Sequence, residues 1–423
     1  MHSSDAGTIH IIGAGLAGLA AAERASRSHR AVAIHEATAQ AGGRCRSYYD
    51  QATGMMIDNG THLLLSGNHT ALSFTEAIGS RSGLRGPEEA QFAFVDIASG
   101  EQWTLRFGDS RFPWWVFDKD RRVPQTGVID YLPLARLAWV GADRPLGDVM
   151  KCAGPIYDRF LEPLMLAALN IAPQEGSAKL AGAIVRETLA LGGQACRPLL
   201  AFEGLGSVFV EPAITHLRMR GVAIAFEDEL VELLFGNGRT SGLKFAKQTI
   251  DLGENDAVIL AVPPYVATSL LPNLVAPSSF RGIVNAHFRV DPPPHLPPIL
   301  GVINGTCEWI FPLSSRISAT ISDGGRLFDI PRTDLAETIW NDIAKVAGLS
   351  NTLPPWQIVR ERRATFAATP EQNAQRPAAE TSWKNLFLAG DWTQTGLPAT
   401  IEGAIRSGYR AADLVQHRLK AAA

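Results

Sequence analysis

Three glycines near the start of the chain constrain its fold more than any other feature. Gly13, Gly15 and Gly18 follow an apolar run at residues 8–12, and the acidic Glu36 stands eighteen residues after Gly18. In a turn of this spacing the first glycine makes the bend, the second lets a pyrophosphate approach the backbone, and the third lets the next helix pack on the strand. Free N–H groups at the start of that helix face the phosphates, and the acidic residue can bind a ribose. The spacing therefore predicts a site for an adenine dinucleotide.

The residues around the turn agree with this prediction. Residues 19–26 are rich in alanine and are typical of a helix, and residues 31–35 are typical of a second strand. Leu16 and Ala17 begin the helix, so we expect their amides at the site, and we expect Ala37 there beside Glu36. A bound dinucleotide makes a redox enzyme the leading expectation.

Composition excludes several other classes of protein. The 423 residues are 46% apolar and 19% charged, which indicates a globular chain of two or three domain-sized units. A net charge of −3 does not favour a nucleic-acid binder. The four cysteines are far apart in the sequence, which argues against disulfides and against a metal site, and favours a reducing, cytoplasmic location. We find no targeting segment and no run of about 18 apolar residues, so we expect no membrane span.

Further strands of the same sheet are expected much later in the chain. Apolar runs at residues 222–226, 230–235, 243–245, 256–262 and 386–389 indicate strands, and residues 400–419 indicate a helix. We therefore predict an α/β fold with a discontinuous Rossmann-like nucleotide-binding domain and an inserted α+β substrate domain. The nucleotide-binding domain comprises residues 1–64, 201–263 and 372–423, and the substrate domain comprises residues 65–200 and 264–371.

A second dinucleotide motif is missing. Residues 204–207 contain two glycines but no third glycine and no preceding strand, so we expect them to cap a helix at residues 208–220. The sequence does not name the electron donor. The missing motif favours another protein or a quinone over direct reduction by a nicotinamide.

The continuation after Glu36 points to FAD. Gly42 and Gly43 permit a close approach of the backbone, and Arg44 can offset the charge of a pyrophosphate. An acidic residue followed by this Gly-Gly-Arg turn resembles the fingerprint of FAD-dependent amine oxidases, phytoene desaturases and protoporphyrinogen oxidases. The resemblance implies FAD rather than NAD, and an amine-oxidase-like fold. It also places the adenine beside the strand near Leu230, and Val262 joins the predicted cofactor site.

The C-terminal region resembles the second flavin signature of the same superfamily. In the run Leu388-Ala389-Gly390-Asp391-Trp392, the resemblance assigns the aspartate to the ribitol or phosphate region of FAD. A helix that begins near Thr400 would place its positive end by the flavin pyrimidine. This stretch contains no cysteine, so we expect non-covalent FAD. The cofactor residues predicted here are Gly390, Asp391, Ala399, Thr400, Ile401 and Ala404.

Three longer strings indicate a narrower resemblance. Residues 58–68, 162–170 and 391–403 are similar to the squalene-associated FAD-dependent desaturases, also called hydroxysqualene dehydroxylases. In the superfamily the first string lies beside the flavin ring, which adds Gly60, Thr61 and His62 to the cofactor site. The resemblance implies reductive removal of the hydroxyl of hydroxysqualene, giving squalene for hopanoid synthesis.

Such a reaction needs a proton donor for the departing hydroxyl and a hydride from reduced flavin. His62 is the candidate donor because histidine titrates near neutral pH, and Asp58 is a second candidate. A packing role for His62 remains an alternative. The competing functions are a carotenoid or phytoene desaturase, an amine oxidase and a non-catalytic flavin or prenyl carrier.

An aromatic run at residues 112–117 and leucine-rich stretches at residues 132–140 and 161–169 are open to three interpretations. They can form ordinary core, line a channel for a polyisoprenoid, or dock on a membrane beside Lys119, Arg121 and Arg122. Peripheral association with the inner face of the membrane is therefore an expectation that the sequence leaves open.

Overall fold

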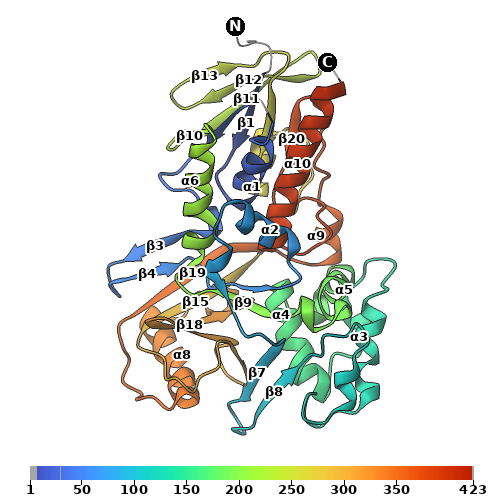
Figure 1. The fold of residues 1–423 in the computed structure, drawn as a ribbon, viewed down its shortest axis with the longest axis vertical. Coiled ribbons are helices and arrows are strands. Elements are labelled where there is room, and N and C mark those ends of the chain that lie inside the picture. The colour runs from blue at the N-terminus through green and yellow to red at the C-terminus, as the bar shows by residue number, and fades with distance from the viewer. Residues whose placement is uncertain (1–6, 29, 422–423) are drawn as a thin grey trace.

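The first strand lies at the centre of a five-stranded parallel sheet, whose order is β10-β2-β1-β14-β20. β1 (Thr8–Ile12) pairs with β2 (Ala31–His35) on one side and with β14 (Ala257–Leu260) on the other. β10 (Ala223–Ala225) and β20 (Leu386–Leu388) complete the sheet. Segments far apart in the sequence therefore meet in one sheet (Figure 1), which confirms the predicted discontinuous Rossmann-like fold.

The computed structural model describes residues 7–28 and 30–421. Residues 1–6, 29, 422 and 423 belong to the ranges predicted for the nucleotide-binding domain and lie outside the described residues.

The parallel sheet is covered on both faces. Helices α1 (Leu16–Ala25), α6 (Glu211–Met219) and α10 (Ile401–Ala421) share one core with Ala257 and Ile259 of β14. Val258 and Leu260 point to the other face, where an antiparallel sheet packs. That sheet contains β11 (Leu230–Gly236), β12 (Arg239–Phe245) and β13 (Thr249–Asp251). Double coverage explains why β14 is an unbroken apolar run rather than an alternating one.

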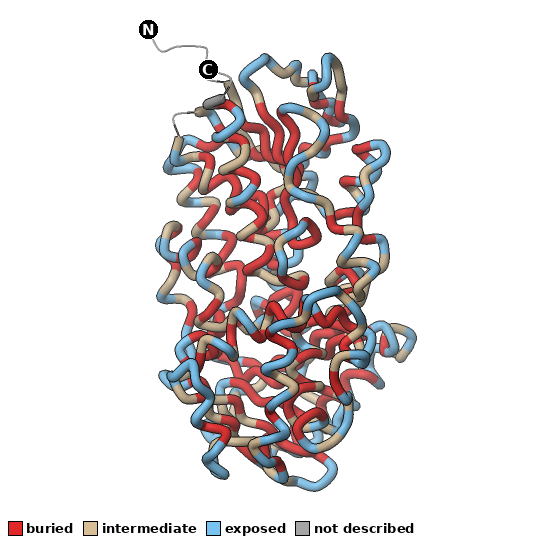
Figure 2. Tube along the Cα trace, turned by 90° about the vertical axis from the view of Figure 1, so that its right-hand side faces the viewer, coloured by how far each residue is buried: buried red, intermediate tan, exposed pale blue. Residues whose placement is uncertain are grey.

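A seven-stranded mixed sheet forms the other half of the molecule, in the order β19-β15-β18-β17-β16-β7-β8. Its strands are β7 (Gln91–Asp96), β8 (Gln102–Arg106), β15 (Phe280–Arg289), β16 (Leu300–Ile303), β17 (Trp309–Leu313), β18 (Arg316–Ile321) and β19 (Trp356–Phe366). Helix α8 (Arg332–Ala347) packs on one face. The other face shares a core with α3 (Leu132–Leu137), α4 (Glu162–Leu169) and α5 (Ala178–Glu187). Figure 2 shows buried chain running through both halves.

The strand patterns identified in the sequence do not include β7 and β8. Phe92, Phe94 and Val95 of β7 are all buried, since both faces of the sheet are covered. The strand therefore lacks the alternation of apolar and polar residues by which a half-exposed strand is recognised.

The remaining elements connect the two halves. Hairpin β3 (Ser47–Asp50) and β4 (Met55–Asp58) forms a two-stranded sheet, and β5 (Leu63–Leu65), β6 (Leu84–Arg85) and β9 (Pro198–Ala201) form a three-stranded one. The short helices are α2 (His69–Ala77), α7 (Pro264–Leu270) and α9 (Pro370–Ala374). Helix α2 lies in a segment predicted for the substrate domain, yet its first amides bond to Glu402 of α10.

No helix among the described residues is both long and apolar enough to cross a bilayer.

Candidate functional site

The glycine turn has the geometry that its spacing predicts. Gly13 has φ +104°, and a side chain there would lie 2.6 Å from the carbonyl oxygen of Ala261. A side chain on Gly18 would collide with the Gly13 carbonyl. Gly15, by contrast, faces open space, with no atom within 4 Å of where its Cβ would be. The turn is therefore packed against protein at Gly13 and Gly18 and open at Gly15, as a site for an approaching phosphate requires.

Unpaired amides point from this turn. The first helical bond runs from the Leu19 amide to the Gly15 carbonyl, at 2.9 Å. The amides of Leu16, Ala17 and Gly18 therefore have no acceptor within the helix. No side chain caps α1 and its first turn has no acidic residue, so nothing in the helix itself competes for an anion.

The second glycine pair lies directly beside the first turn. The Gly42 amide donates to the Ala14 carbonyl at 2.8 Å, and a Cβ on Gly43 would lie 3.5 Å from the Cα of Gly15. Both residues have positive φ, +108° and +54°, which favours glycine. The two motifs, separate in sequence, thus form one backbone-lined surface.

Glu36 stands at the end of β2, next to the turn. One carboxylate oxygen accepts the Ala14 amide at 2.7 Å, and the other accepts the amide and hydroxyl of Thr38 at 3.0 and 2.7 Å. Ala37, which follows it, is exposed. Glu36 is half-buried, so part of the residue stays accessible beside the turn.

Leu230, predicted beside the adenine, and Val262, predicted in the cofactor site, lie at or just beyond the ends of β11 and β14. Leu230 is buried at the start of β11. Val262 follows β14, with a methyl group 3.7 Å from the Cβ position of Gly13, and its carbonyl accepts the indole N–H of Trp392 at 2.9 Å.

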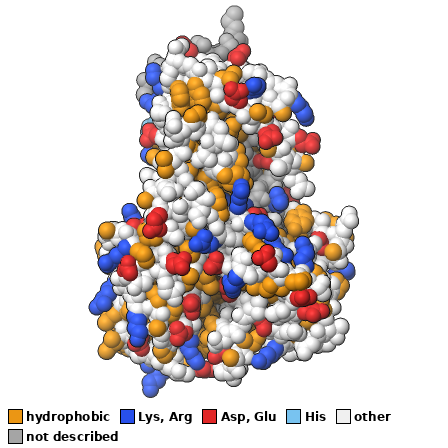
Figure 3. All heavy atoms as spheres, turned by 180° about the vertical axis from the view of Figure 1, so that it is seen from behind, with side chains coloured by type: hydrophobic (Ala, Val, Ile, Leu, Met, Phe, Trp, Pro, Cys, Tyr) orange, Lys and Arg blue, Asp and Glu red, His pale blue; other side chains and the backbone are white. Residues whose placement is uncertain are grey.

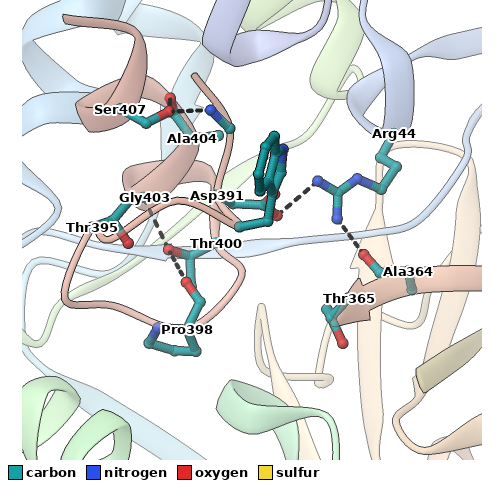
Figure 4. Close-up of polar contacts among 12 residues, drawn as sticks. Arg44, Ala364, Thr365, Asp391, Thr395, Pro398, Thr400, Gly403, Ala404 and Ser407 are labelled. Carbon is teal, nitrogen blue, oxygen red and sulfur yellow. Dashed lines mark hydrogen bonds and ion pairs between the residues drawn. The ribbon is translucent and has the colours of Figure 1, made fainter. Parts of the chain in front are cut away.

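An ion pair joins the two ends of the chain at this site (Figure 4). A guanidinium nitrogen of Arg44 lies 2.7 Å from a carboxylate oxygen of Asp391, and the other terminal nitrogen donates to the Ala364 carbonyl. Asp391 is buried, whereas the Arg44 side chain is 46% exposed. The pair therefore presents its cationic partner at the surface of the site, where it can meet a phosphate.

Arg376 is a buried residue that the sequence analysis missed. Its guanidinium donates to the carbonyls of Asp391 and Leu397, at 2.9 and 2.7 Å, and to the Thr395 hydroxyl at 2.6 Å. It also stacks over Phe366, 4.9 Å from the ring centroid. Burial lowers the pKa of Arg376 to about 10, so it stays charged at neutral pH. It fixes the loop after Asp391, and no local motif marks such a role.

Helix α10 begins where the second signature ends. The Thr400 hydroxyl accepts the Gly403 amide at 3.0 Å, and the Thr400 carbonyl accepts the Ala404 amide at 2.9 Å. Ala399, Thr400, Ile401 and Ala404 are all half-buried. Glu402, in the first turn of α10, accepts the first amides of α2 and a guanidinium N–H of Arg406.

Asp58, a candidate acid, is locked in the protein interior. Its carboxylate accepts the Leu205 amide at 2.8 Å and the Ser47 hydroxyl, and lies 3.8 Å from Arg316. Ser47 in turn accepts the Gly206 amide at 2.8 Å. Burial raises the pKa of Asp58 despite these bonds. This carboxylate holds the turn that begins the π-helical Gly206–Val210 segment leading into α6, which explains why residues 204–207 carry two glycines.

His62, the other candidate proton donor, makes fewer hydrogen bonds than Asp58 does. Its Nδ1 lies 2.9 Å from the Gly60 carbonyl and must donate to it, which leaves Nε2 free. Burial by the surrounding protein lowers the pKa of His62, and its side chain keeps contact with solvent. The neighbouring Thr61 hydroxyl is buried without a partner in the protein.

Polar bonds hold this segment against the seven-stranded sheet. Asn59 donates to Glu361 of β19 at 3.1 Å, and a side chain on Gly60 would collide with the Asn285 amide. Asn170, at the end of α4 with φ +53°, donates to the Thr365 hydroxyl at 2.9 Å. The contacts of Asn59 and Gly60 bring both halves of the molecule to one site, and the Asn170 bond fixes α4 to β19 within the seven-stranded half.

The residues present fit an adenine dinucleotide that carries a flavin. The open space before Gly15 and the exposed guanidinium of Arg44 mark a phosphate position. The unpartnered Thr61 hydroxyl is a polar group beside the expected flavin ring. Figure 3 shows Lys and Arg side chains gathered around a hollow at the waist of the molecule, a charge that suits an anionic cofactor. Within the described part of the chain, no cluster of His, Cys, Asp or Glu could hold a metal ion.

His287 gives the site region a pH-dependent stability. It is fully buried, with Nε2 3.1 Å from the Asp58 carbonyl and Nδ1 2.8 Å from the Ser318 hydroxyl, and burial lowers its pKa to about 3. The unfolded chain binds a proton here below about pH 6.5, whereas the folded chain does not. Stability therefore falls as pH drops from 6.5 towards 3, and we expect this histidine to cost about 2 kcal/mol at pH 5.

Urea unfolding at pH 7 and pH 5 measures this loss. In His287→Asn the difference between the two pH values should shrink by about that amount, whatever the stability of the variant at pH 7. His295→Asn, at an exposed histidine, is the matched control and should keep the wild-type difference. An unchanged difference in His287→Asn would contradict the assignment.

Comparison with known proteins identifies the family. A family model described as flavin containing amine oxidoreductase matches residues 16–416. A protein of Rhodopseudomonas palustris named hydroxysqualene dehydroxylase is 56% identical over 409 residues, which cover 96% of this chain and 98% of that protein. One of the same name from Sinorhizobium fredii is 56% identical over 406 residues, covering 96% and 97%.

Solved structures agree on the fold. Cyclohexylamine oxidase from Brevibacterium oxydans superposes with a TM-score of 0.69 at 15% identity, covering 98% of this chain and 99% of that one. The match of the family model over almost the whole chain, at a site that three distant segments assemble, shows that this chain belongs to the flavin-containing amine oxidoreductases.

Proposed function

We propose that this chain is an FAD-dependent hydroxysqualene dehydroxylase, which reductively removes a hydroxyl group to give squalene in squalene and hopanoid biosynthesis. The observation that carries the proposal is the 56% identity, over nearly the full length of both chains, to proteins of that name. The site supports it, because Arg44, beside the dinucleotide turn, bonds the Ala364 carbonyl of β19, in a sheet with one face rich in large apolar side chains.

We propose that the flavin is non-covalently bound FAD. The glycine turn and Arg44 would hold the pyrophosphate, Glu36 the adenosine ribose, and Asp391 the ribitol or phosphate region. Two observations support non-covalent binding. The C-terminal signature contains no cysteine, and Cys45, the cysteine next to Arg44, is a buried thiol whose pKa burial raises, so that it stays protonated.

The chemistry divides between cofactor and protein. Reduced FAD, when bound, supplies a hydride to the allylic carbon. The protein must provide a proton, so that the hydroxyl departs as water, and must exclude solvent from the carbon that becomes electron-poor. We propose His62 as the proton donor, because its Nδ1 is bonded to Gly60, its Nε2 is free and its side chain is accessible. Asp58 is engaged by the Leu205 amide and the Ser47 hydroxyl, and therefore acts through structure.

We further propose that the protein works in the cytoplasm, at the inner face of the membrane, and receives electrons from an external donor. The four free thiols fit a reducing compartment. The substrate class would be a polyisoprenoid that partitions into bilayers, which makes peripheral association useful.

Product analysis tests the function. The chemically reduced protein, incubated without oxygen with hydroxysqualene, should yield squalene and oxidised flavin in equal amounts. Phytoene offered to the oxidised protein should yield no conjugated polyene. Polyene formation without dehydroxylation would instead indicate a desaturase, and lipid binding without turnover would indicate a carrier.

Glu36→Ala should weaken FAD binding about ten- to a hundredfold, because a charged hydrogen bond is worth about 1.5–3 kcal/mol. Titration of the apoprotein with FAD, followed by flavin fluorescence, gives the dissociation constant. Glu254→Ala, at an exposed acidic residue of a loop, is the control and should bind like the wild type. Equal affinities in both variants would remove Glu36 from the site.

His62→Gln should lower the rate of dehydroxylation about a hundredfold or more, the usual contribution of a general acid, while FAD still binds. Because the pKa of His62 is lowered, its protonated fraction is small at pH 7 and grows as pH falls. The wild-type rate should therefore rise from pH 8 to pH 6, and this rise should vanish in the variant. A variant that keeps both the rate and the pH profile would assign His62 to packing.

A further inference from the structure

Large apolar side chains gather on one exposed segment of the molecule. Of the twelve large hydrophobic residues exposed among those described, six fall between residues 112 and 139. They are Phe112, Trp114, Phe117, Ile129, Leu132 and Trp139, which are 53–87% exposed. We call these six residues the apolar face. Single exposed apolar residues are ordinary, but this concentration is not.

The aromatic run divides into an inner and an outer set. In the 3-10 helix Trp114–Phe117, Trp115 and Val116 are buried, and Trp115 packs edge-on against Phe107 at 4.9 Å. The rings of Phe112, Trp114 and Phe117 lie outside and contact one another, at 4.3 and 6.0 Å between centroids. The inner residues belong to the hydrophobic core, whereas the outer rings are exposed to solvent.

A second element continues the apolar face. Trp115 also packs against Tyr131, at 5.2 Å, which ties the 3-10 helix to the turn before α3. Tyr131 and Leu137 point inward and are buried, whereas Leu132 and Trp139 point outward. The two elements are thus held side by side by their inner residues and expose their outer ones together.

The charge of this segment complements an anionic surface. Residues 111–139 contain five basic and three acidic side chains, in a chain whose overall net charge is −3. Of the acidic groups, Asp118 lies 3.8 Å from Arg121, and Asp130 accepts the Gly127 amide at 2.7 Å. Arg111, Lys119 and Arg136 are exposed. Exposed Trp and Phe rings flanked by Lys and Arg are typical of a segment that lies in a lipid interface.

We propose that the apolar face docks on a bilayer that contains anionic lipid, with its rings inserted among the lipids and its basic side chains at the headgroups. This proposal rests on the proposed function in one respect, because that function implies a polyisoprenoid substrate dissolved in the bilayer. The docking itself needs no substrate. A lipid surface suits this face better than a second copy of the chain, because identical basic segments would repel each other.

Vesicle flotation tests the docking with the FAD-loaded full-length protein. The vesicles are phosphatidylcholine alone, or phosphatidylcholine mixed with phosphatidylglycerol. The wild type should float with the mixed vesicles and less with the neutral ones. Trp114→Ser/Trp139→Ser should bind at least tenfold more weakly. Met219→Ser/Val275→Ser, which changes two exposed apolar residues elsewhere, should float like the wild type.

Three results would overturn the proposal. The first is a wild type that does not float, and the second is a tryptophan variant that floats as well as the wild type. The third is a vesicle-free dimer that the tryptophan variant abolishes, which would assign the face to a second copy. Dehydroxylation of hydroxysqualene in detergent micelles separates the two proposals, because the tryptophan variant should keep it. Flotation without any such turnover would count against the proposed function and leave the docking intact.

Discussion

The ion pair between Arg44 and Asp391 forms only when the whole half that contains the parallel sheet has folded. The pair then completes the candidate site. Its partners are 347 residues apart in sequence, and they meet only because β20 pairs with β14 and β14 pairs with β1. Arg376 then donates a hydrogen bond to the carbonyl of Asp391 and fixes the backbone there. Neither end of the chain can form the site alone. We therefore expect cofactor binding to require the assembled parallel sheet, and the bound cofactor to stabilise that sheet.

Polar contacts, rather than apolar burial alone, set how the two halves meet. Asn59 bonds Glu361, and His287 bonds the carbonyl of Asp58, each across the boundary between the glycine-turn half and the seven-stranded sheet. Apolar burial has no preferred direction, whereas a buried hydrogen bond fixes distance and angle. The segment that contains His62 is held between these bonds. The local bond of Nδ1 to the Gly60 carbonyl leaves Nε2 free, and the bonds between the two halves fix where this segment lies.

Much of the backbone geometry at the candidate site was predictable, because most of its requirements are local. Gly13 takes a positive φ and Gly18 packs on the Gly13 carbonyl, so the spacing of these glycines indicated the turn, whereas the close contact of Gly13 with Ala261 comes from the fold. Arg44 and Asp391 were recognised from resemblance, each beside its own motif. Arg376 left no comparable signal. It acts on loop carbonyls that the fold brings to it, and a lone arginine has no sequence pattern.

By itself the sequence determined the strand–turn–helix unit, the parallel sheet built from distant segments, and the family of the cofactor, since backbone geometry and apolar runs encode all three. Tertiary structure alone decided which aromatic residues are core and which are surface. Trp114 and Trp115 are adjacent and chemically identical, and the packing of Phe107 and Tyr131 against Trp115 distinguishes the two. It also separated Asp58 from His62, because burial and hydrogen-bond partners come from segments that no local pattern connects.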